Sequence, residues 1–170
     1  MNSVMNPSPV RLHSDPDYLL FDLMLPQQKA LWVRVNQEIL KESSFLDQRV
    51  LPKALAKIRT PINWLTANKQ VPDRPLRWVF HCGHVGSTLL SRLLDGTQSR
   101  VLREPQVLRS LASTRREVGF SWSPWSLDEW WQTLAGPSIH SLSRHKDSEY
   151  GVLIKATSAT SNMMGDILQR

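Results

Sequence analysis

Apolar residues in the first third of the chain recur at the spacing of a helix. Leu31, Val35 and Ile39 lie four residues apart and would form one stripe, with Pro26 in the first turn of that helix. A second helix is predicted over residues 47–59. Its inward positions would be Val50, Leu51, Leu55 and Ile58.

The segments on either side of these helices lack such a pattern. Residues 1–16 have no apolar run and are predicted to be a disordered lead-in. Residues 68–75 hold two prolines without periodicity and are predicted to be a linker. The pattern therefore predicts a helical N-terminal region over residues 17–70, followed by a second region that begins at residue 76.

From residue 76 onward, short apolar strands alternate with helices. The predicted strands are Leu76–Cys82, Val101–Glu104 and Gly151–Lys155. The predicted helices are Gly86–Leu94, one that begins at Pro105 and carries Leu108 and Leu111, and Ser158–Gln169. This alternation predicts an α/β domain over residues 76–170, a three-layer αβα arrangement around a parallel sheet of three strands.

A tryptophan-rich stretch lies between the second and third predicted strands. Ser126 followed by Glu129 is a capping box, which predicts a helix that begins there. Gly136-Pro137 would end that helix, and residues 138–150 are polar and typical of a loop. We expect the tryptophans of this stretch to pack in the core or a lid, with contact to an acceptor molecule as the alternative.

Charge and cysteine content narrow the function classes. The formal net charge is +6 and the pI about 9.9, which favours anionic partners such as nucleotides or sulfated molecules. The basic residues are dispersed without a recognition motif, so nucleic acid is an unlikely partner. One cysteine, Cys82, favours a reducing compartment such as the cytoplasm. We expect no membrane span and no metal, since apolar runs are short and metal-ligand spacing is absent.

The segment Gly83–Thr88, of sequence GHVGST, joins the first predicted strand to its helix. Its two glycines permit positive φ and let backbone N–H groups converge on an anion, and the helix N-terminus adds further donors. The segment is not a Walker A loop, because only two residues separate its glycines and no Lys follows Gly86. A phosphate-binding loop and a plain strand-to-helix turn of small residues both explain the glycine pair.

Three segments together resemble the sulfotransferase family of P-loop proteins. They are FHCGHVGSTLLSRLL, VLREPQVLRSLA and VLIKATS. The resemblance covers residues 77–170 and implies a P-loop NTPase-like fold. It also implies transfer of a sulfuryl group from 3′-phosphoadenosine 5′-phosphosulfate (PAPS) to a hydroxyl or amine acceptor.

The resemblance also assigns roles to residues. The donor's 5′-phosphosulfate would be held by the loop and its helix, at Gly83, His84, Val85, Gly86, Ser87, Thr88 and Arg92. Glu104, at the end of the second strand, would be the catalytic base, and Lys155, at the end of the third, would add positive charge beside the sulfuryl group. The alternatives stay open: Glu104 pairing with Arg103 or another Arg, Lys155 as a surface lysine, and Arg92 facing solvent.

Two features depart from the family pattern. His84 stands where the family's loops carry Arg or Lys, so His84→Arg is expected to strengthen PAPS binding. Related domains continue into a fourth strand beside the loop-bearing one, so the domain over residues 76–170 is expected to be incomplete. Leu76–Cys82 would then present an open edge that a partner chain or a second copy would cover. A non-catalytic nucleotide- or anion-binding relative is the alternative function.

Overall fold

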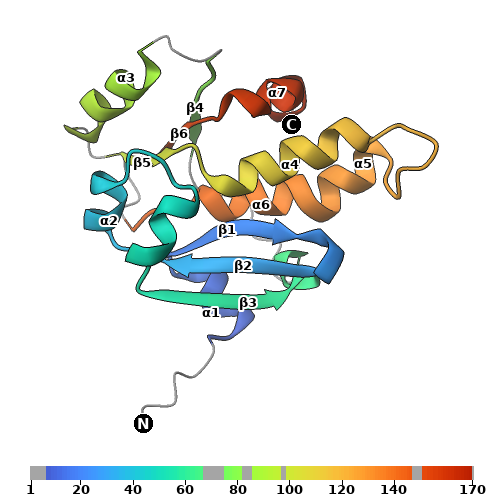
Figure 1. The fold of residues 1–170 in the computed structure, drawn as a ribbon, viewed down its shortest axis with the longest axis horizontal. Helices are drawn as coiled ribbons and strands as arrows, with labels where there is room; N and C mark the ends of the chain where they lie inside the picture. The colour runs from blue at the N-terminus through green and yellow to red at the C-terminus, as the bar shows by residue number, and fades with distance from the viewer. Residues whose placement is uncertain (1–6, 67–74, 82–85, 97–98, 147–150, 170) are drawn as a thin grey trace.

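The computed structural model describes residues 7–66, 75–81, 86–96, 99–146 and 151–169. Within these ranges the chain forms two three-stranded sheets with helices between and around them (Figure 1). One sheet is antiparallel and comes from the N-terminal region. The other is parallel and comes from the region that begins at residue 75. The molecule is therefore mixed α/β in both of its sequence regions.

The antiparallel sheet is a meander of three consecutive strands. They are β1 (Tyr18–Met24), β2 (Lys29–Arg34) and β3 (Ala56–Pro61), in the order β1-β2-β3. A 3-10 turn, η1 (Leu25–Gln27), joins β1 to β2, and Gln28 completes it in the left-handed region at φ 52°. The prediction of a helical N-terminal region over residues 17–70 is therefore wrong for its greater part.

The physical reason is an ambiguity of spacing. Positions four residues apart lie on one face of a helix, but they also lie on one face of a strand, because four is a multiple of two. The alternation in β3 is clear in the structure, where Ile58 and Thr60 are buried while Lys57 and Arg59 are exposed. Pro26 lies in the turn η1 rather than at the start of a long helix.

The remaining N-terminal elements are short helices. They are α1 (Pro9–Ser14), α2 (Gln37–Glu42) and the 3-10 segments η2 (Gln48–Lys53) and η3 (Ile62–Thr66). Ser8 caps α1 by accepting from the Arg11 N–H, and Leu12 is fully buried. The predicted disordered lead-in over residues 1–16 is therefore wrong for α1, and residues 1–6 lie outside the described residues.

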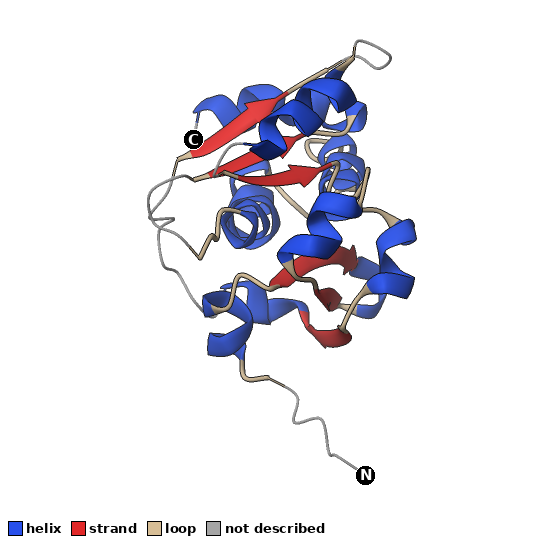
Figure 2. Ribbon diagram, turned by 90° about the vertical axis from the view of Figure 1, so that its left-hand side faces the viewer, coloured by secondary structure: helices blue, strands red, loops and turns tan. Residues whose placement is uncertain are grey.

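The parallel sheet confirms the three strands predicted in the second region. They are β4 (Leu76–Val79), β5 (Arg100–Arg103) and β6 (Val152–Lys155), in the order β4-β6-β5. Every residue of β5 and β6 is buried, as expected for parallel strands covered on both faces, whereas β4 is partly exposed. Figure 2 shows β4 at the top of the molecule, farthest from the meander.

Helices connect and cover these strands. They are α3 (Ser87–Leu93), η4 (Leu94–Gly96), α4 (Gln106–Glu117), α5 (Leu127–Trp130), the π-helix η5 (Trp131–Ala135), α6 (Gly136–Leu142), η6 (Ser158–Met163) and α7 (Met164–Gln169). The predicted capping box at Ser126 and Glu129 is confirmed. The predicted helix end at Gly136-Pro137 is wrong, and so is the loop at residues 138–142. The π-helix η5 leads directly into α6 without a helix end. Pro137 lies in the first turn of α6, where a missing N–H is tolerated.

Helices α4 and α6 lie between the two sheets and join them into one body (Figures 1 and 2). Both pack against β1, and one continuous hydrophobic core includes residues of both sheets, among them Trp32 of β2 and Ile154 of β6. Trp32 donates its indole N–H to Thr60, and Trp130 donates to Thr114, so each buried indole is satisfied. The N-terminal sheet thus packs on α4 and α6, and α2 contacts β5 of the parallel sheet.

Candidate functional site

The carboxyl ends of the three parallel strands bring two predicted residues together. Glu104 directly follows β5, and Lys155 is the last residue of β6. The Lys155 Nζ donates to Glu104 Oε1 at 2.5 Å, and the Glu104 backbone N–H donates to the Lys155 carbonyl at 2.8 Å. The two residues proposed from sequence for catalysis therefore form one ion pair at the edge of the sheet where α/β proteins bind ligands.

This ion pair is buried. The Lys155 side chain is 1% exposed and that of Glu104 is 10% exposed, so Lys155 is not a surface lysine. Glu104 adopts a left-handed backbone conformation, with φ 48°, which few residues other than glycine favour. Such conformations persist where the surroundings hold them, and they occur often at functional sites.

The second carboxylate oxygen of Glu104 is held less tightly than the first. Arg109, on the first turns of α4, donates to Glu104 Oε2 at 3.3 Å, and its side chain is 47% exposed. His81, which follows β4, places Nε2 3.6 Å from Glu104 Oε1. Arg103 does not pair with Glu104 but with Asp95. Oε2 is thus the oxygen that a molecule arriving from the side of Arg109 can approach.

A segment of the N-terminal region forms one wall of the site. The Leu46 N–H donates to the Arg103 carbonyl at 2.7 Å, and the Leu46 carbonyl accepts from the Gln106 N–H at 2.9 Å. These two bonds bracket Glu104 and hold Phe45 over the ion pair, with the Lys155 Nζ 5.3 Å from the ring centroid. Sequence reasoning missed Phe45, because no local pattern indicates a contact between segments so distant along the chain.

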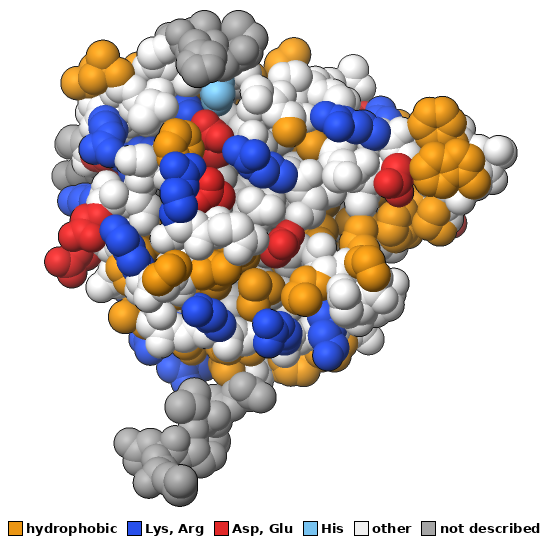
Figure 3. Space-filling view, viewed as in Figure 1, with side chains coloured by type: hydrophobic (Ala, Val, Ile, Leu, Met, Phe, Trp, Pro, Cys, Tyr) orange, Lys and Arg blue, Asp and Glu red, His pale blue; other side chains and the backbone are white. Residues whose placement is uncertain are grey.

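Further cations surround this wall. The Arg49 guanidinium lies 4.3 Å from the Phe45 ring centroid and donates twice to Asp47, at 2.8 and 2.6 Å. Those hydrogen bonds from Arg49 are the main reason why the pKa of Asp47 lies below its ordinary value. Figure 3 shows basic side chains around acidic ones between α2 and the start of α4. The site therefore presents an exposed rim of positive charge beside a buried carboxylate.

The predicted loop residues are described in part. Gly83, His84 and Val85 lie outside the described residues. Gly86 precedes α3 at φ 76°, a conformation that suits glycine, and its carbonyl accepts from the Leu90 N–H at 3.0 Å. Ser87 and Thr88 occupy the first turn of α3, and Ser87 is buried. The left-handed glycine at the start of a helix is the geometry predicted for this turn.

Arg92 contacts the segment that carries Phe45. Its Nη2 donates to the Ser44 hydroxyl at 2.6 Å, and its side chain is exposed. It therefore does not face solvent alone. No hydrogen bond of the Arg92 side chain to the described residues of the loop, 86–88, is found.

Searches for metal sites and membrane spans gave no candidate in the described ranges. No three His, Cys, Asp or Glu residues among them are grouped so as to hold a metal ion. None of the helices described is both long enough and apolar enough to cross a membrane. Comparison of the chain with protein-family models, with curated proteins and with solved structures found no match.

Proposed function

We propose that this protein is a sulfotransferase-like enzyme that transfers a sulfuryl group from PAPS to a hydroxyl or amine acceptor, on a P-loop NTPase-like fold. The observation that carries the proposal is the contact between Glu104 and Lys155 at the carboxyl ends of β5 and β6. The resemblance to the sulfotransferase family assigns both residues to catalysis. Their contact at the carboxyl ends of the strands supports a site at this edge of the sheet, where open α/β sheets bind ligands.

In the proposed reaction, Glu104 accepts the proton of the acceptor while the acceptor oxygen or nitrogen forms its bond to sulfur. The bond between sulfur and the bridging phosphate oxygen breaks, and 3′-phosphoadenosine 5′-phosphate (PAP) leaves with that oxygen. Oε2 of Glu104 is the proposed proton acceptor, because Oε1 is occupied by the Lys155 ammonium. Lys155 thereby orients the carboxylate, and Phe45 shields the pair from water.

The donor is proposed to bind at the turn before α3. Gly86 in its left-handed conformation and the hydroxyls of Ser87 and Thr88 support this placement, as does the excess of positive charge in the chain. Arg109 lies beside the proposed base, and its half-exposed guanidinium would stabilise developing negative charge. We place the proposed reaction in a reducing compartment such as the cytoplasm, because the chain has a single cysteine.

Ligand binding tests the donor assignment. We expect PAP and PAPS to raise the melting temperature, since any ligand that binds the folded state stabilises it by about 2.7 kcal/mol at a hundred times its Kd. ATP and GTP should give no comparable shift. Equal stabilisation by PAP, ATP and inorganic pyrophosphate would favour the non-catalytic anion-binding alternative, and no response to any of them would contradict both functions.

A matched pair of variants tests the base assignment. Glu104→Gln keeps an oxygen that accepts from Lys155 but removes the proton-accepting carboxylate, so release of PAP from PAPS should fall about 10²- to 10⁴-fold while PAP binding persists. Asp47→Asn changes a carboxylate in the same charged rim and should leave turnover within a few-fold of wild type. Equal turnover in Glu104→Gln and wild type would contradict the role of Glu104.

A further inference from the structure

Three cations share two carboxylates at the candidate site. Lys155 is paired with Glu104, and Arg49 donates twice to Asp47. Among the described residues, Arg109 has no carboxylate of its own, because the one that it contacts, Glu104, already holds the Lys155 ammonium. The rim beside the proposed base therefore carries an excess of positive charge, and that excess is located on Arg109.

The Arg109 guanidinium can bind a ligand while it stays beside Glu104. Its hydrogen bond to Glu104 Oε2 comes from Nη2 alone, at 3.3 Å, whereas a guanidinium has several N–H donors. The side chain is 47% exposed, so a ligand can reach it. The charge of Arg109 also contributes to the lowered pKa of Asp47, after the hydrogen bond from Arg49, which is the largest cause. Arg109 therefore lies near both carboxylates of the rim.

The surroundings of Arg109 add to its attraction for an anion. Helix α4 begins at Gln106 without a side-chain cap and has no acidic residue in its first turn, so the positive end of its dipole adds to the charge of Arg109. Phe45, whose ring lies over the Glu104–Lys155 pair, is half-buried and offers an apolar surface to the carbon skeleton of a ligand. The rim thus combines one excess positive charge with an aromatic contact.

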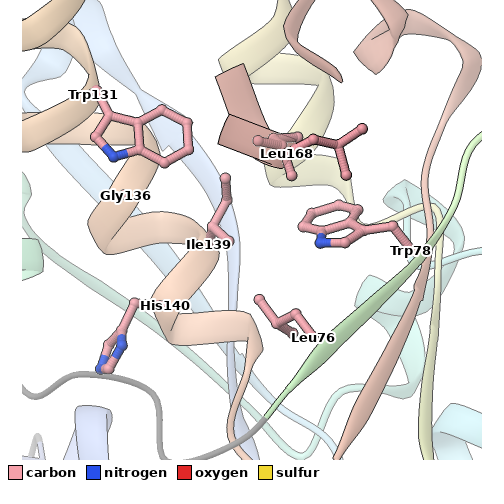
Figure 4. A pocket seen from close by; sticks show the side chains of 8 residues that line it. Leu76, Trp78, Trp131, Gly136, Ile139, His140 and Leu168 are labelled. Carbon is pink, nitrogen blue, oxygen red and sulfur yellow. The ribbon is translucent and has the colours of Figure 1, made fainter. Parts of the chain in front are cut away.

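The cavity between β4, α6 and α7 has a different character (Figure 4). It measures about 410 Å³, and the described residues that line it include no Arg, Lys, Asp or Glu. The indole rings of Trp78 and Trp131 lie on opposite sides of it. An ionised group would lose its water there without a permanent counter-charge, which is costly. We therefore expect an anionic ligand at the rim and not in this cavity.

We propose that the acceptor of sulfuryl transfer carries a carboxylate that Arg109 binds, an inference that rests on the function proposed above. The hydroxyl or amine of the same molecule would then lie at Glu104 Oε2. Because Arg109 Nη2 and Glu104 Oε2 are 3.3 Å apart, the carboxylate and the reacting group are separated by only a few bonds. Hydroxy acids, amino acids and uronic acids have this arrangement. A carboxylate carries the single charge that matches Arg109, whereas a phosphate monoester carries about two.

Binding of matched small molecules in the presence of saturating PAP tests the inference on the full chain. The pairs are glucuronate with glucose, and lactate with propylene glycol. Within each pair a carboxylate replaces a CH₂OH group. We expect each carboxylate to bind about ten- to a hundredfold more tightly than its neutral partner in NMR titrations, because a hydrogen bond to a charged group is stronger than one to a neutral group.

Two variants locate the preference. Arg109→Gln should abolish it without weakening PAP binding. Arg116→Gln removes the same charge from an exposed position two turns further along α4 and should retain it. Equal binding within both pairs, no binding of either carboxylate at millimolar concentrations, or a preference that survives Arg109→Gln would overturn the inference. Weaker PAP binding in Arg109→Gln would assign the charge to the donor and would overturn it as well.

The same titrations without PAP separate this inference from the proposed function. Stabilisation by PAP without any preference for carboxylates would overturn the acceptor class and leave the sulfotransferase function in place. A carboxylate preference that Arg109→Gln abolishes, in a chain that does not respond to PAP, would support the carboxylate site and contradict sulfuryl transfer.

Discussion

Two groups of buried cations, one at each end of the parallel sheet, are held in different ways. At the amino end, Arg100 opens β5 and donates to the Arg144 carbonyl at 2.8 Å, and Arg144 donates to the carbonyls of Leu12, Asp15 and Tyr18. At the carboxyl end, the buried cation Lys155 is held instead by a carboxylate, that of Glu104. The same kind of charge is thus satisfied by backbone oxygens at one end and by an ionised side chain at the other.

The buried arginines at the amino end hold the fold together, whereas charged groups at the carboxyl end can be reached by a ligand. Burial lowers the pKa of Arg144 to about 9 and that of Arg100 to about 10. Their hydrogen bonds to carbonyls join α1 and β1 to the segment after α6, and the charge of Asp15, for Arg100 also that of Asp17, partly offsets the effect of burial. At the carboxyl end, an oxygen of Glu104 and the guanidinium of Arg109 face an approachable rim. The comparison predicts that substitutions at the two ends affect different properties.

The largest effect on stability is expected for Arg144→Met. It leaves four carbonyls, that of Ser141 included, without this donor. Unsatisfied buried groups cost about 1–3 kcal/mol each, partly offset by removal of a buried charge. We expect a loss of about 3 kcal/mol in the free energy of unfolding, measured by urea denaturation. Arg144→Lys should lose less. If the folded variant still responds to PAP as wild type does, the amino end serves stability alone. A loss of unfolding free energy below about 1 kcal/mol would contradict this structural role of Arg144.

Arg103→Met should combine both kinds of effect. Arg103 lies at the carboxyl end, yet its Nη1 donates to the carbonyls of Leu40 and Ser43, at 3.0 and 3.1 Å, and it also pairs with Asp95. We expect a loss of about 2 kcal/mol in unfolding free energy together with weaker turnover, because the segment that carries Phe45 loses its anchor. Stability loss with unchanged turnover would show that this wall is not needed for the reaction.

His13 gives the amino end a pH dependence. Its Nε2–H donates to the Trp64 carbonyl at 2.8 Å, and burial is the main cause that lowers its pKa below the ordinary value of 6.5. As pH falls below 6.5, the unfolded chain binds the proton before the folded one does, so unfolding free energy declines. The decline should end once pH passes the lowered native pKa. Chemical denaturation of wild type and His13→Gln at several pH values measures this, and equal slopes would contradict it.

The smallest effect on stability is expected for Arg109→Met. The ion pair with Glu104 is long at 3.3 Å and half exposed on the arginine side, so it should contribute less than about 1 kcal/mol to folding. Turnover should nevertheless fall, since the variant removes positive charge beside the proposed base. Denaturation and PAP release, measured on the same sample, separate the two results. A larger loss of unfolding free energy than for Arg103→Met would show that Arg109 mainly stabilises the fold.

The sequence predicted the second region better than the first. The strand positions were predicted, and Glu104 and Lys155 were placed at strand ends, which meet at one edge of a parallel sheet. The ion pair between them was not predicted. The strand order β4-β6-β5 was not, since no residue in a four-residue strand specifies which neighbour it pairs with. The meander was missed because Leu31 was grouped with Val35 and Ile39 on one helical stripe, whereas Leu31 lies in β2 and Ile39 in α2. The turn at Pro26 fits a helix start as well as a hairpin.

The wall of the site could not be predicted for a different reason. Phe45 and Leu46 reach Glu104 through backbone hydrogen bonds to Arg103 and Gln106, and such contacts depend on tertiary docking rather than on local sequence. Gly136 and Pro137 illustrate the same limit, because the π turn before them joins two helices where the sequence predicts a helix end. A Cβ at Gly136 would lie 3.0 Å from the Trp131 carbonyl oxygen, which explains the glycine only once the fold is known.

The contact of Arg103 with α2 also bears on the rate of folding. Its two partners, Leu40 and Ser43, lie 63 and 60 residues earlier in the chain. Contacts at such separation form only after a long loop closes, which slows folding and makes it cooperative. We expect the wall over Glu104 to form when the N-terminal region docks on the parallel sheet. A chain in which the sheets have formed but not docked would hold Glu104 and Lys155 without that wall.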